Sequence, residues 1–292
     1  MNKLLSWFRQ LDENLVKIFL VIFIFLVPLW PKLPIKMINY TYIAIRFDDI
    51  YLAILAFVFF VQLLRKKVLI NRKFIFPFAF FLLAVISSYL WNSYISKAIE
   101  FPHLGLLHTL RRIEYMIMFF IASSVIKTKK DFWQIISFFF FSVLIVVLYG
   151  LGQKFLNFPA VQTMNPEYAK GYILYLTPEA RISSTFGGHY DLAIYLVLAI
   201  PLILSFYFSK KKSAYLYLFI IALLILLYTS SRSSFIAYFV ATVGFLLFIR
   251  KFKFLIFTLV LTAGLMFITG EITKRFLQTF QVRRILIDDR TG

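Results

Sequence analysis

The chain contains no cysteine, which excludes disulfide bonds and any chemistry based on a thiolate. Its three histidines do not fall beside Asp or Glu at metal-ligand spacing, so neither a metal site nor a cofactor is expected. Acidic residues are scarce as well: 13 Asp and Glu stand against 32 Lys and Arg, for a net charge of +19. The basic residues lie in short clusters between apolar runs, a pattern that sets membrane topology and does not predict a nucleic-acid partner.

Hydrophobic residues make up 61% of the chain, whereas a soluble domain is about half apolar. We therefore predict an all-α, polytopic transmembrane helical bundle surrounded by membrane lipids. Nine apolar runs are long enough to cross about 30 Å of hydrocarbon, and they cover residues 15–31, 48–64, 74–92, 104–126, 132–151, 190–208, 214–231, 233–249 and 254–270. No small-residue cleavage site follows the first run, which favours an uncleaved helix over a signal peptide.

The distribution of Lys and Arg predicts the orientation of these spans. Compact basic clusters occur at 65–73, 127–130, 210–212 and 250–253, and all of them fall on the side of the N-terminus. Cytoplasmic loops carry such clusters, so the N-terminus is predicted to be cytoplasmic.

The opposite, outer side then holds the longest internal polar stretch, a loop over residues 152–189. Within it, aromatic residues alternate over 171–177, and residues 181–186 are predicted to pair back onto them as a strand. The chain thus divides into a transmembrane domain, 1–270, and a basic outer tail, 271–292. The tail is expected either to lie on anionic lipid as an amphipathic helix or to begin a longer outer loop.

Two segments place an arginine among small hydroxyl residues at the outer end of a predicted span. They are Arg181 to His189, with the sequence RISSTFGGH, and Tyr228 to Ser234, with the sequence YTSSRSS. A cation in such surroundings is costly unless it faces a polar cavity or the headgroup zone. Guanidinium is permanently charged and binds phosphate through two donors, so Arg181 and Arg232 are candidates to hold a phosphorylated lipid. The alternative is that both only extend to the membrane interface.

A second group of charges lies in the outer half of the fourth span. Helical spacing brings His108, Arg111, Arg112 and Tyr115 near one face, with Glu114 beside them. Arg112 is either a second phosphate or acceptor contact or part of an interfacial ion pair that anchors the helix end, and the ion pair is the preferred interpretation of Arg111.

Two single residues and one pair of acidic residues admit two interpretations each. His189 is either a general base or a polar residue capping the start of a helix. Asp191 is a secondary candidate that is also explained by the dipole of a helix N-terminus alone. The pair Asp48 and Asp49 is either a helix cap or a metal site of the kind used by glycosyltransferases acting on polyprenyl-phosphate sugars.

The order of these motifs resembles that of the O-antigen ligase and O-antigen polymerase superfamily over about residues 40–292. The matching stretches are Tyr149 to Gln153, then Arg181 to Leu196 with Pro201 further on, then Thr229 to Ser234. Asp191 departs from the family, which usually has Asn there. The family also continues beyond the outer segment at 271–292 into a long periplasmic loop with further helices.

The resemblance implies a metal-independent glycosyltransferase of the bacterial inner membrane. Its donor would be an undecaprenyl-pyrophosphate-linked glycan, and its acceptor lipid A core or another glycan. Arg181 and Arg232 are the positions that the resemblance assigns to the pyrophosphate. A transporter or flippase of anionic lipid-linked saccharides would use the same arginines without chemistry, but the sequence shows no inverted repeat, which favours the enzyme.

Overall fold

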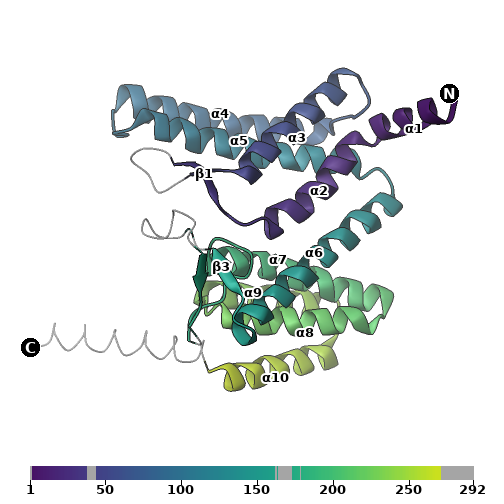
Figure 1. The fold of residues 1–292 in the computed structure, drawn as a ribbon, viewed down its shortest axis with the longest axis vertical. Helices are drawn as coiled ribbons and strands as arrows, with labels where there is room; N and C mark the ends of the chain where they lie inside the picture. The colour runs from purple at the N-terminus through teal and green to yellow at the C-terminus, as the bar shows by residue number, and fades with distance from the viewer. Residues whose placement is uncertain (1, 38–43, 162, 164–172, 178, 271–292) are drawn as a thin grey trace, which may run out of the picture. The chain divides into compact units, whose positions relative to one another are not determined.

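A computed structural model describes residues 2–37, 44–161, 163, 173–177 and 179–270. The predicted tail, 271–292, lies outside these residues. Within them the chain forms ten α-helices and two short two-stranded sheets (Figure 1). The helices are α1 (Asn2–Glu13), α2 (Leu15–Leu29), α3 (Phe47–Leu64), α4 (Ile75–Leu90), α5 (Pro102–Val125), α6 (Lys129–Phe155), α7 (His189–Lys210), α8 (Ser213–Tyr228), α9 (Arg232–Phe248) and α10 (Phe252–Thr269). A 3₁₀ turn, η1 (Arg72–Phe74), precedes α4, and a π-helical turn, η2 (Trp91–Ile95), follows it.

Each of the nine predicted spans coincides with one helix from α2 to α10. Five helical segments in the described part of the chain are long and apolar enough to cross a membrane: α3, η1 to η2, α6, α7 and α10. The apolar helices α2, α8 and α9 are shorter, with 15 to 17 residues. The described part of the chain is therefore mostly helical with five candidate membrane-spanning segments, and crossing by all nine stays a prediction.

The helices belong to two compact units. The first comprises Met1–Val27 and Phe47–Phe138, and its core joins α2, α3 and α5 through residues such as Leu20, Leu55 and Ile121. At one end of this unit Asp12 accepts hydrogen bonds from Gln62, Arg65 and Lys67, which ties α1 to the end of α3.

The second unit comprises Pro28–Arg46 and Phe139–Gly292, and α7 lies at its centre. Helices α8 and α9 both pack along α7, as Figure 1 shows. One side of α7 is fully buried, with Leu192, Leu196 and Ile203 at 0% exposure. This packing fixes the end of α7 that carries His189 against the turn between α8 and α9.

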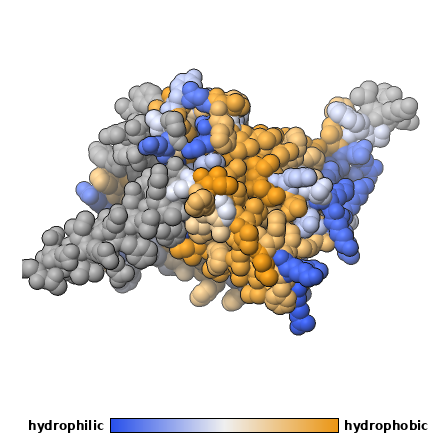
Figure 2. Space-filling view, turned by 90° about the horizontal axis from the view of Figure 1, so that it is seen from below, coloured by the Kyte–Doolittle hydropathy of each residue, from blue (hydrophilic) through white to orange (hydrophobic). Residues whose placement is uncertain are grey.

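Large apolar side chains remain exposed on helices that would face lipid. On α10, Ile256, Val260 and Phe267 are 62%, 67% and 90% exposed. Figure 2 shows a broad hydrophobic surface on one face of the molecule, with hydrophilic residues at its margins. In water such a surface would be unfavourable, whereas hydrocarbon covers it without cost.

The two sheets are β1 (Pro34–Met37) with β2 (Ala44–Arg46), and β3 (Pro159–Val161) with β4 (Ile173–Tyr175), both antiparallel. The predicted pairing of 171–177 with 181–186 is therefore wrong, because β4 pairs with β3. Residues 182–184 are instead buried against the helices, and Ser184 gives its backbone N–H to the side chain of Gln153. A strand partner would have to displace those contacts.

Candidate functional site

The two arginine-containing segments meet at one end of the second unit. The backbone N–H of Ile182 donates to the carbonyl oxygen of Tyr228 across 3.3 Å. Ile182 follows Arg181 directly, and Tyr228 is the last residue of α8, four positions before Arg232. Arg232 is the first residue of α9, where its side chain is exposed. The sequence placed both segments at the same membrane face, and the structure joins them by a backbone hydrogen bond.

Arg181 contacts His189, the other basic candidate of its segment. A guanidinium nitrogen of Arg181 lies 2.7 Å from Nε2 of His189, and both side chains are half-buried. Arginine has no acceptor, so Nε2 must accept, and the ring is then neutral with its proton on Nδ1. Gly188 holds the N-cap position of α7 without a side-chain bond. His189 therefore binds Arg181 rather than capping the helix.

Gln153, near the end of α6, holds the first segment in place. Its side-chain oxygen accepts from the backbone N–H of Ser184 at 2.7 Å, and its nitrogen donates to the carbonyl oxygens of Ser184 and Pro159 at 2.9 and 3.0 Å. Gln153 is only 3% exposed, so these bonds are sheltered from water. In the sequence Gln153 stands out only as the last residue of the Tyr149–Gln153 motif, and nothing there marks this role.

The hydroxyl groups of the first segment are mostly committed to backbone carbonyls. Ser184 donates to Val146 at 2.7 Å, and Thr185 donates to Pro28. Ser183 differs, because its hydroxyl is buried and has no hydrogen-bond partner within the part of the chain that the structure describes. A buried polar atom without a partner is unusual in proteins and points to a water molecule or a polar ligand.

A serine in each segment adopts the left-handed backbone conformation. The φ angles are 51° at Ser184 and 52° at Ser230. A residue with a Cβ atom occupies this region at some energetic cost, and such positions concentrate at binding and catalytic sites. In both segments the neighbouring hydrogen bonds hold the conformation, through Gln153 at Ser184 and through Leu227 at Ser230.

A third cation approaches the same region from α6. The ammonium group of Lys154 lies 4.8 Å from the centre of the Tyr228 ring, within the range of a cation–π contact. Phe155 packs edge-to-face against the same ring. Lys154, Arg181 and Arg232 are therefore grouped around Tyr228, Ile182 and the α8–α9 turn.

Asp191 lies among basic residues from the segment between α2 and α3. Both Arg46 and Lys32 are within electrostatic range of its carboxylate. Lys32 is 6% exposed and packs against Gly187, where a Cβ atom would collide with the hydroxyl of Thr163. Because Gly187 has no side chain, Thr163 and Lys32 can both lie close to its backbone.

Thr163 links this cluster to the first segment. Its backbone N–H donates to the carbonyl oxygen of Gly187 at 2.8 Å, and its hydroxyl accepts from Arg46 at 3.3 Å. Sequence reasoning missed Lys32 and Arg46. Each is a single basic residue in a polar segment, and only the fold shows that it lies beside Asp191.

An apolar cavity of about 260 Å³ borders the first segment. Ser184 and Thr185 form part of its lining, and the remainder is apolar or aromatic, including Leu29, Leu33 and Tyr149. The second unit thus places a hydrocarbon-lined space next to the arginine-containing segment.

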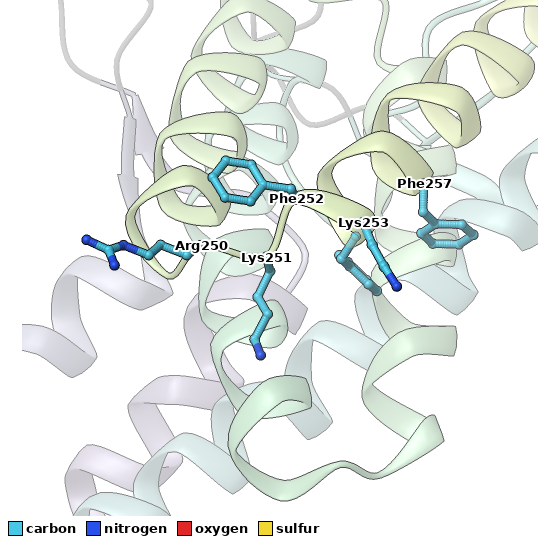
Figure 3. A pocket seen from close by; sticks show the side chains of 6 residues that line it. Arg250, Lys251, Phe252, Lys253 and Phe257 are labelled. Atoms are coloured by element: carbon cyan, nitrogen blue, oxygen red, sulfur yellow. The ribbon is translucent and has the colours of Figure 1, made fainter.

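Another hollow, of about 600 Å³, lies at the turn between α9 and α10. It is lined by Arg250, Lys251 and Lys253 together with phenylalanines, and in Figure 3 the side chains of Arg250 and Lys251 point in different directions. Arg232 and this turn stand at opposite ends of α9, which is 17 residues or about 25 Å long. The basic and aromatic side chains here are typical of a membrane interface.

The remaining candidates lie in the first unit. A guanidinium nitrogen of Arg111 on α5 lies 3.3 Å from the carboxylate of Asp49 on α3, so Arg111 forms the helix–helix ion pair favoured for it. Asp48 and Asp49 both lie in the first turn of α3. Among the described residues no group of three His, Asp or Glu side chains could hold a metal ion. Arg112 is exposed and lines a separate cavity.

Comparisons of the chain with protein-family models, curated proteins and solved structures gave no match.

Proposed function

We propose that this protein transfers a glycan from a polyprenyl pyrophosphate to a lipid or glycan acceptor, in the manner of O-antigen ligases and polymerases. The reaction would take place at the periplasmic face of a bacterial inner membrane, with the N-terminus in the cytoplasm. The observation that carries the proposal is the hydrogen bond between Ile182 and Tyr228, because it brings the segments of Arg181 and Arg232 to one end of the same unit.

The charges of this region suit a pyrophosphate. Arg181, Arg232 and Lys154 are cations that surround the α8–α9 turn, and the guanidinium groups offer paired donors to phosphate oxygens. The hydroxyl of Ser183, which has no hydrogen-bond partner among the described residues, offers a further donor in the same segment. Donors that are fixed before the reaction stabilise the negative charge that develops on a leaving pyrophosphate.

The apolar cavity beside Ser184 and Thr185 suits the lipid part of the same donor. Its lining by Leu29, Leu33 and Tyr149 would cover a short hydrocarbon segment. A polyprenyl pyrophosphate joins an anionic group directly to hydrocarbon, so an apolar cavity lined by the segment that begins at Arg181 suits its hydrocarbon half.

The chemistry follows from this arrangement. A hydroxyl oxygen of the acceptor bonds to the anomeric carbon of the glycan, and the bond from that carbon to the pyrophosphate oxygen breaks with its electron pair going to the pyrophosphate. The hydroxyl proton passes to a base. Nε2 of His189 accepts a bond from Arg181 in this structure, so the role of His189 in the proposal is to orient Arg181.

Substitution of Arg232 tests the proposal. Arg232→Ala should lower glycan transfer about a hundred- to a thousand-fold, the usual effect of losing one donor to a developing anion. Arg232→Lys keeps the charge but loses the paired donors, so it should recover only part of the activity. Transfer is measured as acceptor-linked glycan in a strain that lacks the native copy, at matched membrane levels of each variant.

Arg250→Ala is the matched control, because it removes one arginine from the opposite end of α9 and should leave transfer unchanged. Near-normal transfer by Arg232→Ala would overturn the proposed role. If Arg232→Ala instead abolished export of the lipid-linked glycan while purified wild-type protein gave no transfer, the transporter hypothesis would replace the enzyme.

A further inference from the structure

The first unit contains a cavity that the proposed glycan transfer does not use. It has a volume of about 530 Å³ and lies between α5 and the end of α4 with the π-helical turn η2. All of its lining residues belong to the first unit, so its shape does not depend on the second.

Two basic side chains form one side of this cavity. His108 and Arg112 are four residues apart on α5, which places them on the same face of the helix. Both are exposed, and neither forms a hydrogen bond or ion pair with any residue that the structure describes. The neighbouring Arg111 differs, because it is held by Asp49 and does not line the cavity.

Part of the opposite side of the cavity is apolar. Phe81, Ala84 and Val85 on α4 line it together with Ile99, and Ser88, Tyr89 and Asn92 continue the lining toward η2. Phe81, Ala84 and Val85 lie on a helix expected to be in contact with lipid, where hydrocarbon is the surrounding solvent. A ligand that fills the cavity would therefore meet a positive charge at one side and hydrocarbon at the other.

Local backbone features shape the space between these walls. In η2 the backbone N–H of Ser96 donates to the carbonyl oxygen of Trp91 at 2.9 Å, five residues back, as in a π-helix. Such turns widen a helix and occur frequently at functional sites. Gly105 on α5 lets the Tyr89 ring approach, since a Cβ atom there would lie 3.1 Å from the ring carbons.

We propose that this cavity binds a lipid with a net anionic phosphate headgroup, one whose phosphate charge is not balanced by a cation in the same headgroup. The guanidinium of Arg112 would bind phosphate oxygens through paired donors, His108 would donate a further hydrogen bond, and the chain would lie along Phe81 and Val85. The site has the same charge complementarity as the glycan-donor site but stands on separate residues, so it does not rest on the proposed function.

The experiment measures which lipids stay bound. The full chain is reconstituted in vesicles of equal parts phosphatidylglycerol and phosphatidylcholine, extracted in mild detergent, and analysed by native mass spectrometry. Wild-type protein should retain phosphatidylglycerol in preference, and Arg112→Gln should lower its retention about tenfold, as expected for losing one charged hydrogen-bonding partner.

Two further variants separate the cavity from general surface charge. Arg111→Gln removes the same charge from the adjacent residue and should retain phosphatidylglycerol as the wild type does. Ala84→Phe narrows the cavity without changing charge and should lower retention as Arg112→Gln does.

Three outcomes would overturn the proposal. The first is equal retention of the two lipids by wild-type protein, and the second is equal loss in Arg111→Gln and Arg112→Gln. The third is displacement of phosphatidylglycerol by inorganic phosphate at comparable concentration, because the apolar wall would then contribute nothing and a free phosphate would be the ligand.

Discussion

Arg181 donates a hydrogen bond to Nε2 of His189 across 2.7 Å. Arg181 begins the first arginine-containing segment, and His189 is the first residue of α7. The bond therefore connects the two ends of the stretch 182–188, which contains Ser-Ser-Thr-Phe-Gly-Gly. A neutral histidine that accepts from arginine fixes the direction of the guanidinium group without reducing its charge.

Substitutions of His189 distinguish orientation of Arg181 from general-base catalysis. Glutamine can accept the hydrogen bond from Arg181 but cannot take up a proton, so His189→Gln should keep most of the transfer activity. His189→Ala should lower it about tenfold, the effect of losing one hydrogen bond. Activity is measured by the assay proposed for Arg232. Tyr190→Phe, at the exposed neighbouring position, is the control, and a loss of a hundredfold or more in His189→Gln would favour the base.

Gln153→Ala should destabilise the protein more than any exposed glutamine substitution. It removes Gln153 from the buried N–H and carbonyl oxygen of Ser184, whereas the carbonyl oxygen of Pro159 keeps the hydroxyl of Tyr149 as a donor. Each buried group that loses its partner costs about 1–3 kcal/mol. Thermal unfolding of the detergent-solubilised protein measures the effect, with Gln10→Ala on the exposed face of α1 as the control. Equal unfolding temperatures for the two variants would contradict the role given to Gln153.

Asp12 makes the stability of the first unit depend on pH. Hydrogen bonds from Arg65, Lys67 and Gln62 hold the pKa of its carboxyl well below the usual range. A lowered pKa in the folded state means that the ionised carboxylate stabilises the fold above the unfolded value of about 4, and that this contribution disappears as the pH falls toward the folded value.

The unfolding temperature of wild-type protein should therefore fall as the pH is lowered from about 5 to about 2. Asp12→Asn lacks the charge at every pH, so it should be less stable at neutral pH and should lose less on acidification. Unfolding is followed in detergent over this range. Parallel curves for the two proteins would show that other carboxyl groups account for the pH dependence.

Cysteine labelling tests the orientation, and the structure indicates which positions to use. Ser183 lies in the predicted outer loop but is fully buried, so a cysteine there would react poorly. Glu179, in the same loop, and Ser213, the first residue of α8, are both exposed. Because the chain has no native cysteine, an impermeant thiol reagent should label Glu179→Cys and not Ser213→Cys in intact cells. The reverse pattern would invert the topology.

Hydrophobic length alone predicted the helices well. The nine apolar runs coincide with α2 to α10. Basic clusters separate several of them, because a charge at the centre of a span is costly. The strand prediction for residues 181–186 was wrong. The alternation over 171–177 suggested that 181–186 pair back onto it, but the segment is buried between helices, and its partners Gln153, Val146 and Pro28 are distant in sequence.

The candidate site was predictable only where a residue type conflicts with its surroundings. Arg181 and Arg232 stand out because they are cations beside long apolar runs. Lys32, Arg46 and Lys154 carry the same charge in segments that are already polar, so nothing in the sequence marks them. Their contacts with Gly187, Thr163 and Tyr228 arise from tertiary packing.

The left-handed backbone at Ser184 and Ser230 has a consequence for how substitutions at these positions are interpreted. Glycine and asparagine adopt this conformation readily, whereas valine and isoleucine do not. Tolerance at Ser230 should therefore follow backbone preference more closely than the presence of a hydroxyl. A mutational survey that ranked residues by chemical similarity to serine would place threonine first, although its β-branch makes it a poorer replacement there than glycine.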